Sequence, residues 1–143
     1  MNRLKKYFFI SILVLINSCN ESKDNIMPFY NGGFVKAEGT YKVPKYNLKL
    51  VETKSGLLFG ISDKKNKLLY QSDIFKAFSQ HAFWSLYIDE DFNVWVYNSD
   101  YQETVVLFFD EQKMKFSTKD YCKDKLNLPK EFKKSLNDRL VCQ

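Results

Sequence analysis

Two strongly apolar runs flank a short polar turn in residues 94–109, VWVYNSDYQETVVLFF. The second run is predicted to be a strand that is apolar on both of its faces, because no polar side chain interrupts residues 105–109. A strand of this kind has to be covered on both faces. The sequence supplies only a few short helices for this purpose, so either internal packing or a binding partner covers the rest of the sheet.

Shorter strands separated by polar breaks precede these runs. Apolar and polar side chains alternate over residues 46–50, which is the period of a half-buried strand. Turn signals at 54–56 and 63–66 follow it and indicate two successive hairpins. The predicted fold class is α+β: an antiparallel β-sheet or meander of about six to eight strands with short helices. The predicted strands cover residues 34–43, 46–50, 57–61, 68–71, 84–88, 94–97, 104–109 and 114–116.

A first short helix is predicted over residues 73–78. Ser72 precedes it as a candidate N-cap, and an acid follows in the first turn. Ile74 and Phe78 lie four residues apart, so they share one helix face. That face is expected to lie over the sheet.

Two further helices are predicted at the C-terminal end. Ser117 and Asp120 have the spacing of a capping box, which favours a helix that ends at about Leu126. Pro129 suits the first position of a second helix. An apolar stripe then recurs every fourth residue, at Phe132, Leu136 and Leu140.

The first nineteen residues have the pattern of an export signal. Arg3, Lys5 and Lys6 precede an apolar run at 7–16, and small polar residues lead from there to Cys19. The apolar run is shorter than the roughly 20 residues that a membrane-spanning helix needs. A signal peptide is therefore predicted over residues 1–18.

Residues 16–19, Ile-Asn-Ser-Cys, resemble the lipobox of bacterial lipoproteins. The resemblance implies that Cys19 is acylated and becomes the new amino terminus, so that the chain is held in the cell envelope, at the outer membrane facing the periplasm or at the cell surface. An ordinary cleaved signal and an uncleaved anchor are the alternatives. Residues 19–32 are then a lipid anchor and flexible tether, and residues 33–143 are a single β-rich domain.

The remaining cysteines agree with export. Cys122 and Cys142 form an even pair once Cys19 carries lipid, and an oxidising compartment favours a disulfide between them. The bridge would join the two predicted C-terminal helices; two free thiols are the alternative. A structural zinc site is not expected, because the only histidine is His81.

The charges are divided along the chain. Without the three cations of the signal the net charge is +2, which gives no reason to expect nucleic-acid binding. Residues 81–112 contain seven acids and no lysine or arginine, together with many aromatic rings. Rings that anchor and charges that steer are typical of a protein-binding surface. The predicted partner-binding residues are Trp84, Tyr87, Asp89, Glu90, Asp91, Trp95, Tyr97, Asp100 and Tyr101.

A different interpretation of the same block is internal packing. The acids fall in predicted turns, where aspartate is common for local reasons. The basic segments on either side would then pair with these acids within one fold.

No catalytic residues and no cofactor are predicted. Asp89, Asp91 and Asn93 partly match a calcium loop, but Val94 replaces the required glycine, so a hairpin turn is the better interpretation. His81 has no accompanying motif of a hydrolase. The sequence therefore favours a non-catalytic envelope lipoprotein that binds a partner with a basic surface, in its most concrete form an immunity-type protein that neutralises a basic toxin. A structural or assembly lipoprotein is one alternative, and a binder of a small ligand or glycan through Trp84, Trp95 and Tyr97 is another.

Overall fold

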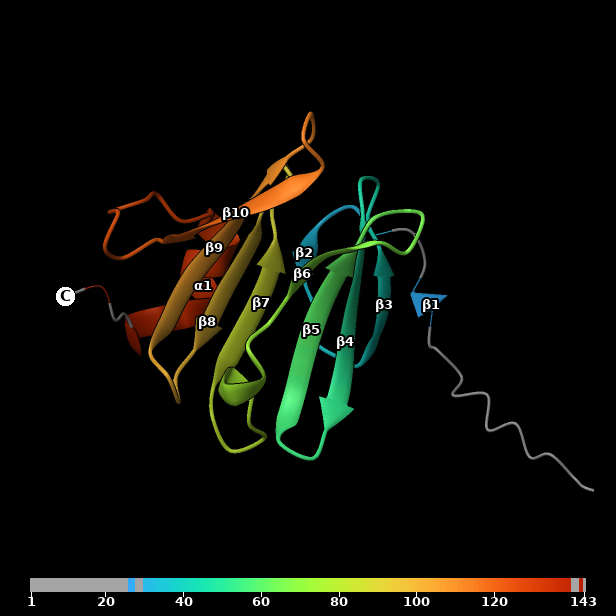
Figure 1. The fold of residues 1–143 in the computed structure, drawn as a ribbon. Coiled ribbons are helices and arrows are strands. Elements are labelled where there is room, and N and C mark those ends of the chain that lie inside the picture. The colour runs from blue at the N-terminus through green and yellow to red at the C-terminus, as the bar shows by residue number, and fades with distance from the viewer. Residues whose placement is uncertain (1–25, 28–29, 140–141, 143) are drawn as a thin grey trace, which may run out of the picture.

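The computed structural model of the chain describes residues 26–27, 30–139 and 142. Its strands form two five-stranded sheets, sheet A in the order β1-β3-β4-β5-β6 and sheet B in the order β10-β9-β8-β7-β2 (Figure 1). The elements are β1 (Ile26–Met27), β2 (Gly33–Phe34), β3 (Gly39–Lys42), β4 (Asn47–Thr53), β5 (Gly56–Ser62), β6 (Leu68–Gln71), the 3-10 turn η1 (Ile74–Lys76), β7 (Trp84–Ile88), β8 (Val94–Asn98), β9 (Glu103–Asp110), β10 (Lys115–Asp120), α1 (Lys130–Leu136) and the 3-10 turn η2 (Asn137–Arg139).

The predicted antiparallel β-rich architecture is confirmed in its coarse form. Within the described residues, every strand pairing is antiparallel except that of β1 with β3. The single sheet expected from the sequence is instead two sheets. The helical part is smaller than expected, because α1 is the only α-helix in the described part of the chain.

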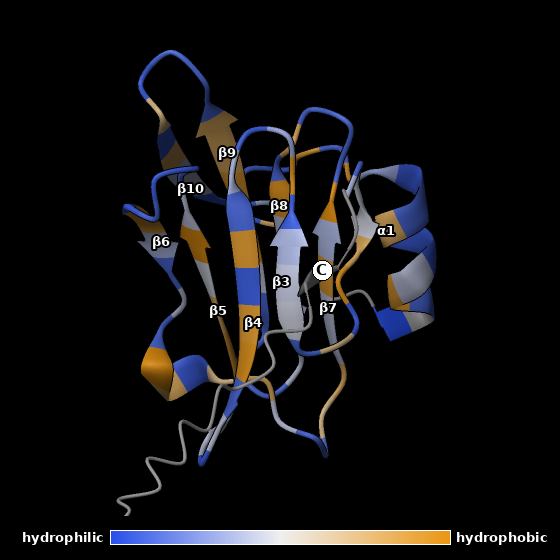
Figure 2. Cartoon of the chain, turned by 90° about the vertical axis from the view of Figure 1, so that its right-hand side faces the viewer, coloured by the Kyte–Doolittle hydropathy of each residue, from blue (hydrophilic) through white to orange (hydrophobic). Residues whose placement is uncertain are grey.

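The inner faces of the two sheets share one hydrophobic core. Leu48 and Leu50 of β4 are fully buried while Lys49 between them is exposed, which confirms the predicted alternation (Figure 2). Sheet B contributes the alternate residues of its central strands. The buried members from both sheets include Tyr41, Leu48, Leu50, Phe59, Ile61, Leu86, Ile88, Val94, Val96 and Leu107.

The outer face of sheet B is covered by α1, which follows Pro129 as predicted. Phe132 and Leu136 of α1 are fully buried against Trp95 and Tyr97 of β8. Leu140, the third member of the predicted stripe, lies outside the described residues. The strand that is apolar on both faces is thus covered by sheet A on one side and by α1 on the other (Figure 2).

The helix predicted from Ser117 to Leu126 is wrong. Residues 115–120 form β10, in which Ser117 pairs with Phe108 of β9, and residues 121–125 form a turn. Asp120 does act as a cap, but of this turn: its Oδ1 accepts hydrogen bonds from the backbone amides of Cys122, at 3.0 Å, and Lys123, at 3.1 Å. Pairing with β9 satisfies the backbone of β10 and replaces the helix that the local sequence favours.

The helix predicted over residues 73–78 is only the single turn η1. Its N-cap is Asp73, whose side chain accepts a hydrogen bond from the Phe75 amide at 2.9 Å, whereas Ser72 instead accepts one from the Phe59 amide of β5. The predicted apolar face is only half buried: Phe78 is 2% exposed and belongs to the core, whereas Ile74 is 59% exposed. Phe75 between them is 78% exposed.

The folded part begins earlier than the predicted boundary at residue 33. Ile26–Met27 form β1, and the Tyr30 amide donates a hydrogen bond to the Lys42 carbonyl at 2.9 Å, so the end of the predicted tether belongs to sheet A. The segment predicted as one extended strand at 34–43 is divided between the two sheets, with β2 in sheet B and β3 in sheet A.

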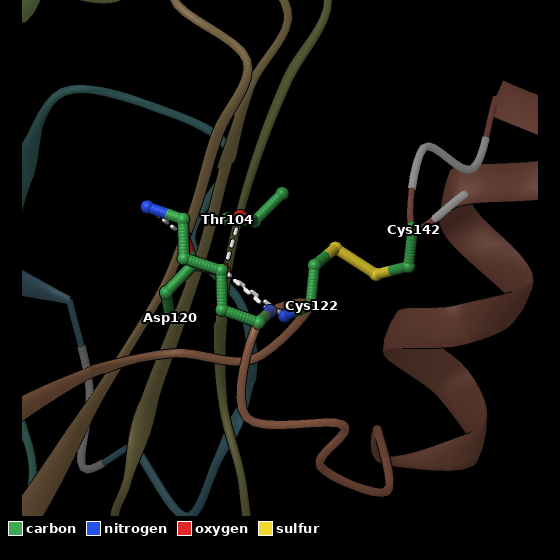
Figure 3. Close-up of a disulfide and its surroundings, with 5 residues drawn as sticks. Thr104, Asp120, Cys122 and Cys142 are labelled. Atoms are coloured by element: carbon green, nitrogen blue, oxygen red, sulfur yellow. Dashed lines mark hydrogen bonds and ion pairs between the residues drawn. A yellow bond between two sulfur atoms is a disulfide. The ribbon is translucent and has the colours of Figure 1, made fainter.

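Cys122 and Cys142 have their sulfur atoms at bonding distance, with their Cα atoms 4.9 Å apart (Figure 3). The predicted pair is therefore present, but Cys122 lies in the turn after β10 and not in a helix. The bridge fastens the segment that follows α1 to the end of sheet B.

Reducing this bridge is expected to lower the free energy of unfolding by about 3 kcal/mol, because the reduced chain regains the entropy of an open loop of this size. The loop is closed by cysteines 20 residues apart. Urea unfolding with and without a reductant measures the loss. A Cys122→Ser, Cys142→Ser variant is the control: its free energy of unfolding should equal that of the reduced protein and should not change with reductant. An unchanged free energy of unfolding of the wild type on reduction would contradict the prediction.

Candidate functional site

The acidic block of the sequence is divided between two ends of sheet B. The turn at 89–93 joins β7 to β8, and the turn at 99–102 joins β8 to β9. β8 holds five residues, which separates the two turns by about 17 Å. Asp100 and Tyr101 therefore lie at the opposite end from Asp89, Glu90 and Asp91, and the predicted partner-binding residues do not form one continuous face.

The aromatic part of the predicted surface is largely internal. Trp95 and Tyr97 are 4% and 5% exposed, because α1 covers them. Trp84 lies on the other face of sheet B, where its ring stacks on Phe78 at a centroid distance of 4.8 Å. These rings cannot serve as exposed anchors, and the three do not line a common pocket for a glycan.

Basic segments neutralise several acids of the block, as the internal-packing interpretation predicted. Glu111 is paired with Lys45, and Asp110 with Lys113 at 3.0 Å. Glu103 lies 4.0 Å from the Lys76 ammonium. Much of the charge pattern is thus used within the fold.

Asp89 organises the β7–β8 turn. Its Oδ1 accepts hydrogen bonds from the backbone amides of Asp91, at 3.0 Å, and Asn93, at 2.9 Å. Its Oδ2 accepts from the Asn93 side-chain amide at 3.0 Å and from the Trp95 indole Nε1 at 2.7 Å. The predicted hairpin turn is present between β7 and β8, and this carboxylate serves the turn and the neighbouring ring.

Beside this turn lies an acidic corner, which we define as Tyr87, Glu90, Asp91 and Glu131. These residues line a depression of about 440 Å³, together with Asp89, Pro129 and Lys130. Within the described residues, no ion pair engages the carboxylates of Glu90, Asp91 or Glu131. Burial first, and then the charges of Asp89, Glu131 and Glu90, raise the pKa of the Tyr87 hydroxyl. The acids outnumber the one cation, Lys130, among the residues that line this depression, and a partly buried phenol lies among them.

Sequence reasoning placed Tyr87, Glu90 and Asp91 at a binding surface but missed Glu131. Glu131 stands in the first turn of α1, more than thirty residues further along the chain. The signal available was the acid directly after Pro129 and Lys130, where an acid favours a helix start. Only the packing of α1 on sheet B brings it to the turn at 89–93.

A second polar cluster surrounds the bridge at the other end of sheet B. The Thr104 hydroxyl donates a hydrogen bond to Asp120 at 2.8 Å (Figure 3). Burial alone would raise the pKa of Asp120, but hydrogen bonds from the Lys123 amide, the Thr104 hydroxyl and the Cys122 amide outweigh it and lower the pKa. This carboxylate is therefore tied into the turn and is a structural group.

No family model matches the sequence, and no curated protein or solved structure is significantly similar to it. Among the residues that the structure describes, no group of three or more His, Cys, Asp or Glu side chains is placed to hold a metal ion. The helices found in that part of the chain lack the length and the apolar content of a membrane-spanning segment.

Proposed function

We propose that the chain is a non-catalytic, lipid-anchored binding protein of the bacterial envelope and that its acidic corner receives a basic segment of a protein partner. The observation that carries the proposal is the convergence of Glu90, Asp91 and Glu131 on one depression without an ion pair among the described residues. Carboxylates left open in this way attract cationic partners and exclude anionic ones. An immunity-type protein that neutralises a basic toxin is the most concrete form of this function.

Reversing the charge of the corner is expected to weaken partner binding. Glu90→Lys with Asp91→Lys should weaken the affinity at least about tenfold, because like charges then face each other across the contact. The matched control is Asp100→Lys, an exposed acid of the same block at the other end of β8. The wild-type affinity should also fall as salt is added.

The measurement has two stages. Chemical crosslinking in the producing cells, followed by purification of the chain, identifies the partner. The same crosslinking is carried out with the wild type, the double variant and the control. The purified partner is then titrated against all three proteins at low and high salt. A partner that binds the double variant as tightly as the control would remove the acidic corner as the binding site. A growth or membrane-integrity defect without any such partner would favour the structural or assembly role.

The anchoring half of the proposal rests on Cys19, which lies outside the described residues. Replacing Cys19 with serine should abolish the uptake of labelled palmitate and release the chain from the membrane fraction, because residue 19 then has no thiol to be acylated. The Cys122→Ser, Cys142→Ser variant is the control and should take up label normally. Equal labelling of wild type and the Cys19 variant would contradict acylation at this residue.

A further inference from the structure

The 3-10 turn η1 lies at the lower end of the molecule in Figure 1, and three of the exposed large apolar side chains belong to this end. Ile74 and Phe75 of η1 are 59% and 78% exposed, and Tyr101 of the turn at 99–102 is 49% exposed. The turn and η1 belong to the same end, because the Asn98 side-chain amide donates a hydrogen bond to the Lys76 carbonyl at 3.1 Å. Exposure of the aliphatic side chain of Ile74 and the aromatic ring of Phe75 to water is unfavourable, because both are large and apolar.

The backbone around η1 is fixed while its side chains are exposed. Phe78, just after η1, is 2% exposed and exchanges two backbone hydrogen bonds of 2.9 Å with Leu57 of β5. Before η1, the Ser72 amide donates to the Phe59 carbonyl at 2.9 Å. The turn thus bulges from a strand edge that holds it on both sides, which presents Ile74 and Phe75 on a rigid support.

The chain also enters the fold from this end. β1 runs parallel to β3, with Ile26 paired to Thr40, so β1 begins at the end of sheet A at which β3 begins. β3 begins at Gly39, which pairs with Leu50, and from there β4 continues to Thr53 at the η1 end. The first described residue of β1, Ile26, therefore lies toward the end of sheet A that carries η1.

The reach of that chain is sufficient. The seven residues from Cys19 to Ile26 span at most about 25 Å. Across the strands of sheet A, Ile26 is level with Gly60 of β5. Phe78, which follows η1, is hydrogen-bonded to Leu57 of β5. Leu57 precedes Gly60 by three residues, so η1 lies about 10 Å further along the strand direction than Ile26. β1 and β6 are the two edges of sheet A, so η1 lies roughly 19 Å to the side of the entry point. An acylated Cys19 can reach the plane of η1 without strain.

We propose that η1 is a second membrane contact: Ile74 and Phe75, with Tyr101 at the same end of the molecule, enter the interfacial layer of the lipid bilayer that holds the acylated Cys19. The inference rests on the lipid anchor of the proposed function. Two contacts on opposite edges of sheet A fix the orientation of the domain, with the acidic corner facing away from the membrane. The charges nearest to η1 are mixed, Asp73, Lys76 and Glu103, so the contact is apolar and does not require anionic lipid.

The test compares two positions of nearly equal exposure at opposite ends of sheet A. Ile74→Cys and Leu68→Cys, at 59% and 62% exposure in the wild type, receive an environment-sensitive fluorophore. Leu68 begins β6 and pairs with Ser62 at the end away from η1. The full acylated chain is reconstituted in vesicles of phosphatidylcholine and phosphatidylethanolamine that carry doxyl-labelled lipid. We expect a blue shift and strong quenching at position 74 and neither at position 68.

The contribution of the Phe75 side chain is tested by adding Phe75→Ser to the chain labelled at position 74. The blue shift should then disappear, because the turn no longer enters the lipid. Phe75 is largely exposed, so this change leaves the fold intact. A chain that sediments with the vesicles but shows equal quenching at both positions overturns the second contact and leaves the anchor in place. A chain that carries no acyl group and does not sediment overturns both. A blue shift that persists in detergent with a dimeric mass assigns the patch to a second copy of this chain, and so also overturns the membrane contact.

Discussion

Replacing Phe132 with alanine is expected to lower the free energy of unfolding by about 4 kcal/mol. The Phe132 side chain is fully buried between α1 and sheet B. Its ring centroid lies 5.9 Å from that of Tyr121, 6.0 Å from Tyr87 and 6.1 Å from Trp95. A helix of seven residues is not stable alone, so α1 depends on this contact. Its loss leaves a cavity under the helix and opens the outer face of β8 to water.

Urea unfolding measures the loss, and tryptophan emission reports its cause. Emission should move to longer wavelength, because Trp95 is covered by α1 in the wild type. The matched control is Lys133→Ala, the next residue on the same helix but exposed, which should change the free energy of unfolding by no more than about 0.5 kcal/mol. Equal effects of the two substitutions would show that the helix does not support sheet B.

The strands and hairpins could be predicted because their signals are local. The alternation over residues 46–50 and the turn residues at 54–56 and 63–66 were enough to place β4, β5 and β6. The segment at 84–88 was predicted with the bounds that β7 has. The division into two sheets could not be predicted in this way, because it depends on where the chain crosses between β2 and β3, and residues 35–38 carry no signal for that crossing.

The C-terminal part misled the prediction because local and distant forces disagree there. Residues 115–120 have few apolar side chains and a capping-box spacing, so the sequence alone favours a helix. β9 is long and offers an open edge, and pairing with it satisfies the backbone of β10 along six residues. Backbone pairing with a partner strand is a tertiary effect, which no local pattern contains.

The candidate site was only partly predictable for a geometric reason. Consecutive hairpins place successive turns at alternate ends of a sheet, so the turns at 89–93 and 99–102 cannot share a surface. The acids of the block are near one another in sequence but not in space. Conversely, Glu131 is distant in sequence and joins the corner through the packing of α1. A prediction that combined the hairpin order with the turn charges would have separated Asp100 from Glu90.

The same geometry links the two proposals. The acidic corner and η1 lie at opposite ends of the molecule, because they stand at the two ends of β8 and its neighbours. If η1 rests on the membrane, the corner is held at the far end of the domain, where a partner can approach it from the aqueous side. An anchor without the second contact would leave the corner free to turn toward the lipid.

Replacing Asp89 with alanine is expected to lower the free energy of unfolding by about 3–4 kcal/mol, a large effect for a residue in a turn. The carboxylate accepts four hydrogen bonds, two from backbone amides of the turn and two from the side chains of Asn93 and Trp95. Its loss leaves the Trp95 indole N–H without its partner in a buried place, which costs about 1–3 kcal/mol by itself. Glu90→Ala, an exposed neighbour in the same turn, is the control and should have little effect.

Replacing Asp89 with asparagine separates the two sides of this carboxylate. The amide keeps one oxygen for the backbone amides that Oδ1 serves, but its NH₂ group then faces the Asn93 amide and the Trp95 indole, which are donors as well. We expect a loss of about 2 kcal/mol, less than for alanine. Adding Trp95→Phe removes the indole donor that opposes the new NH₂ group. The double variant should therefore lose less free energy of unfolding than the two single variants lose together. Additive losses in urea unfolding would show that the Asp89–Trp95 hydrogen bond contributes nothing to the turn.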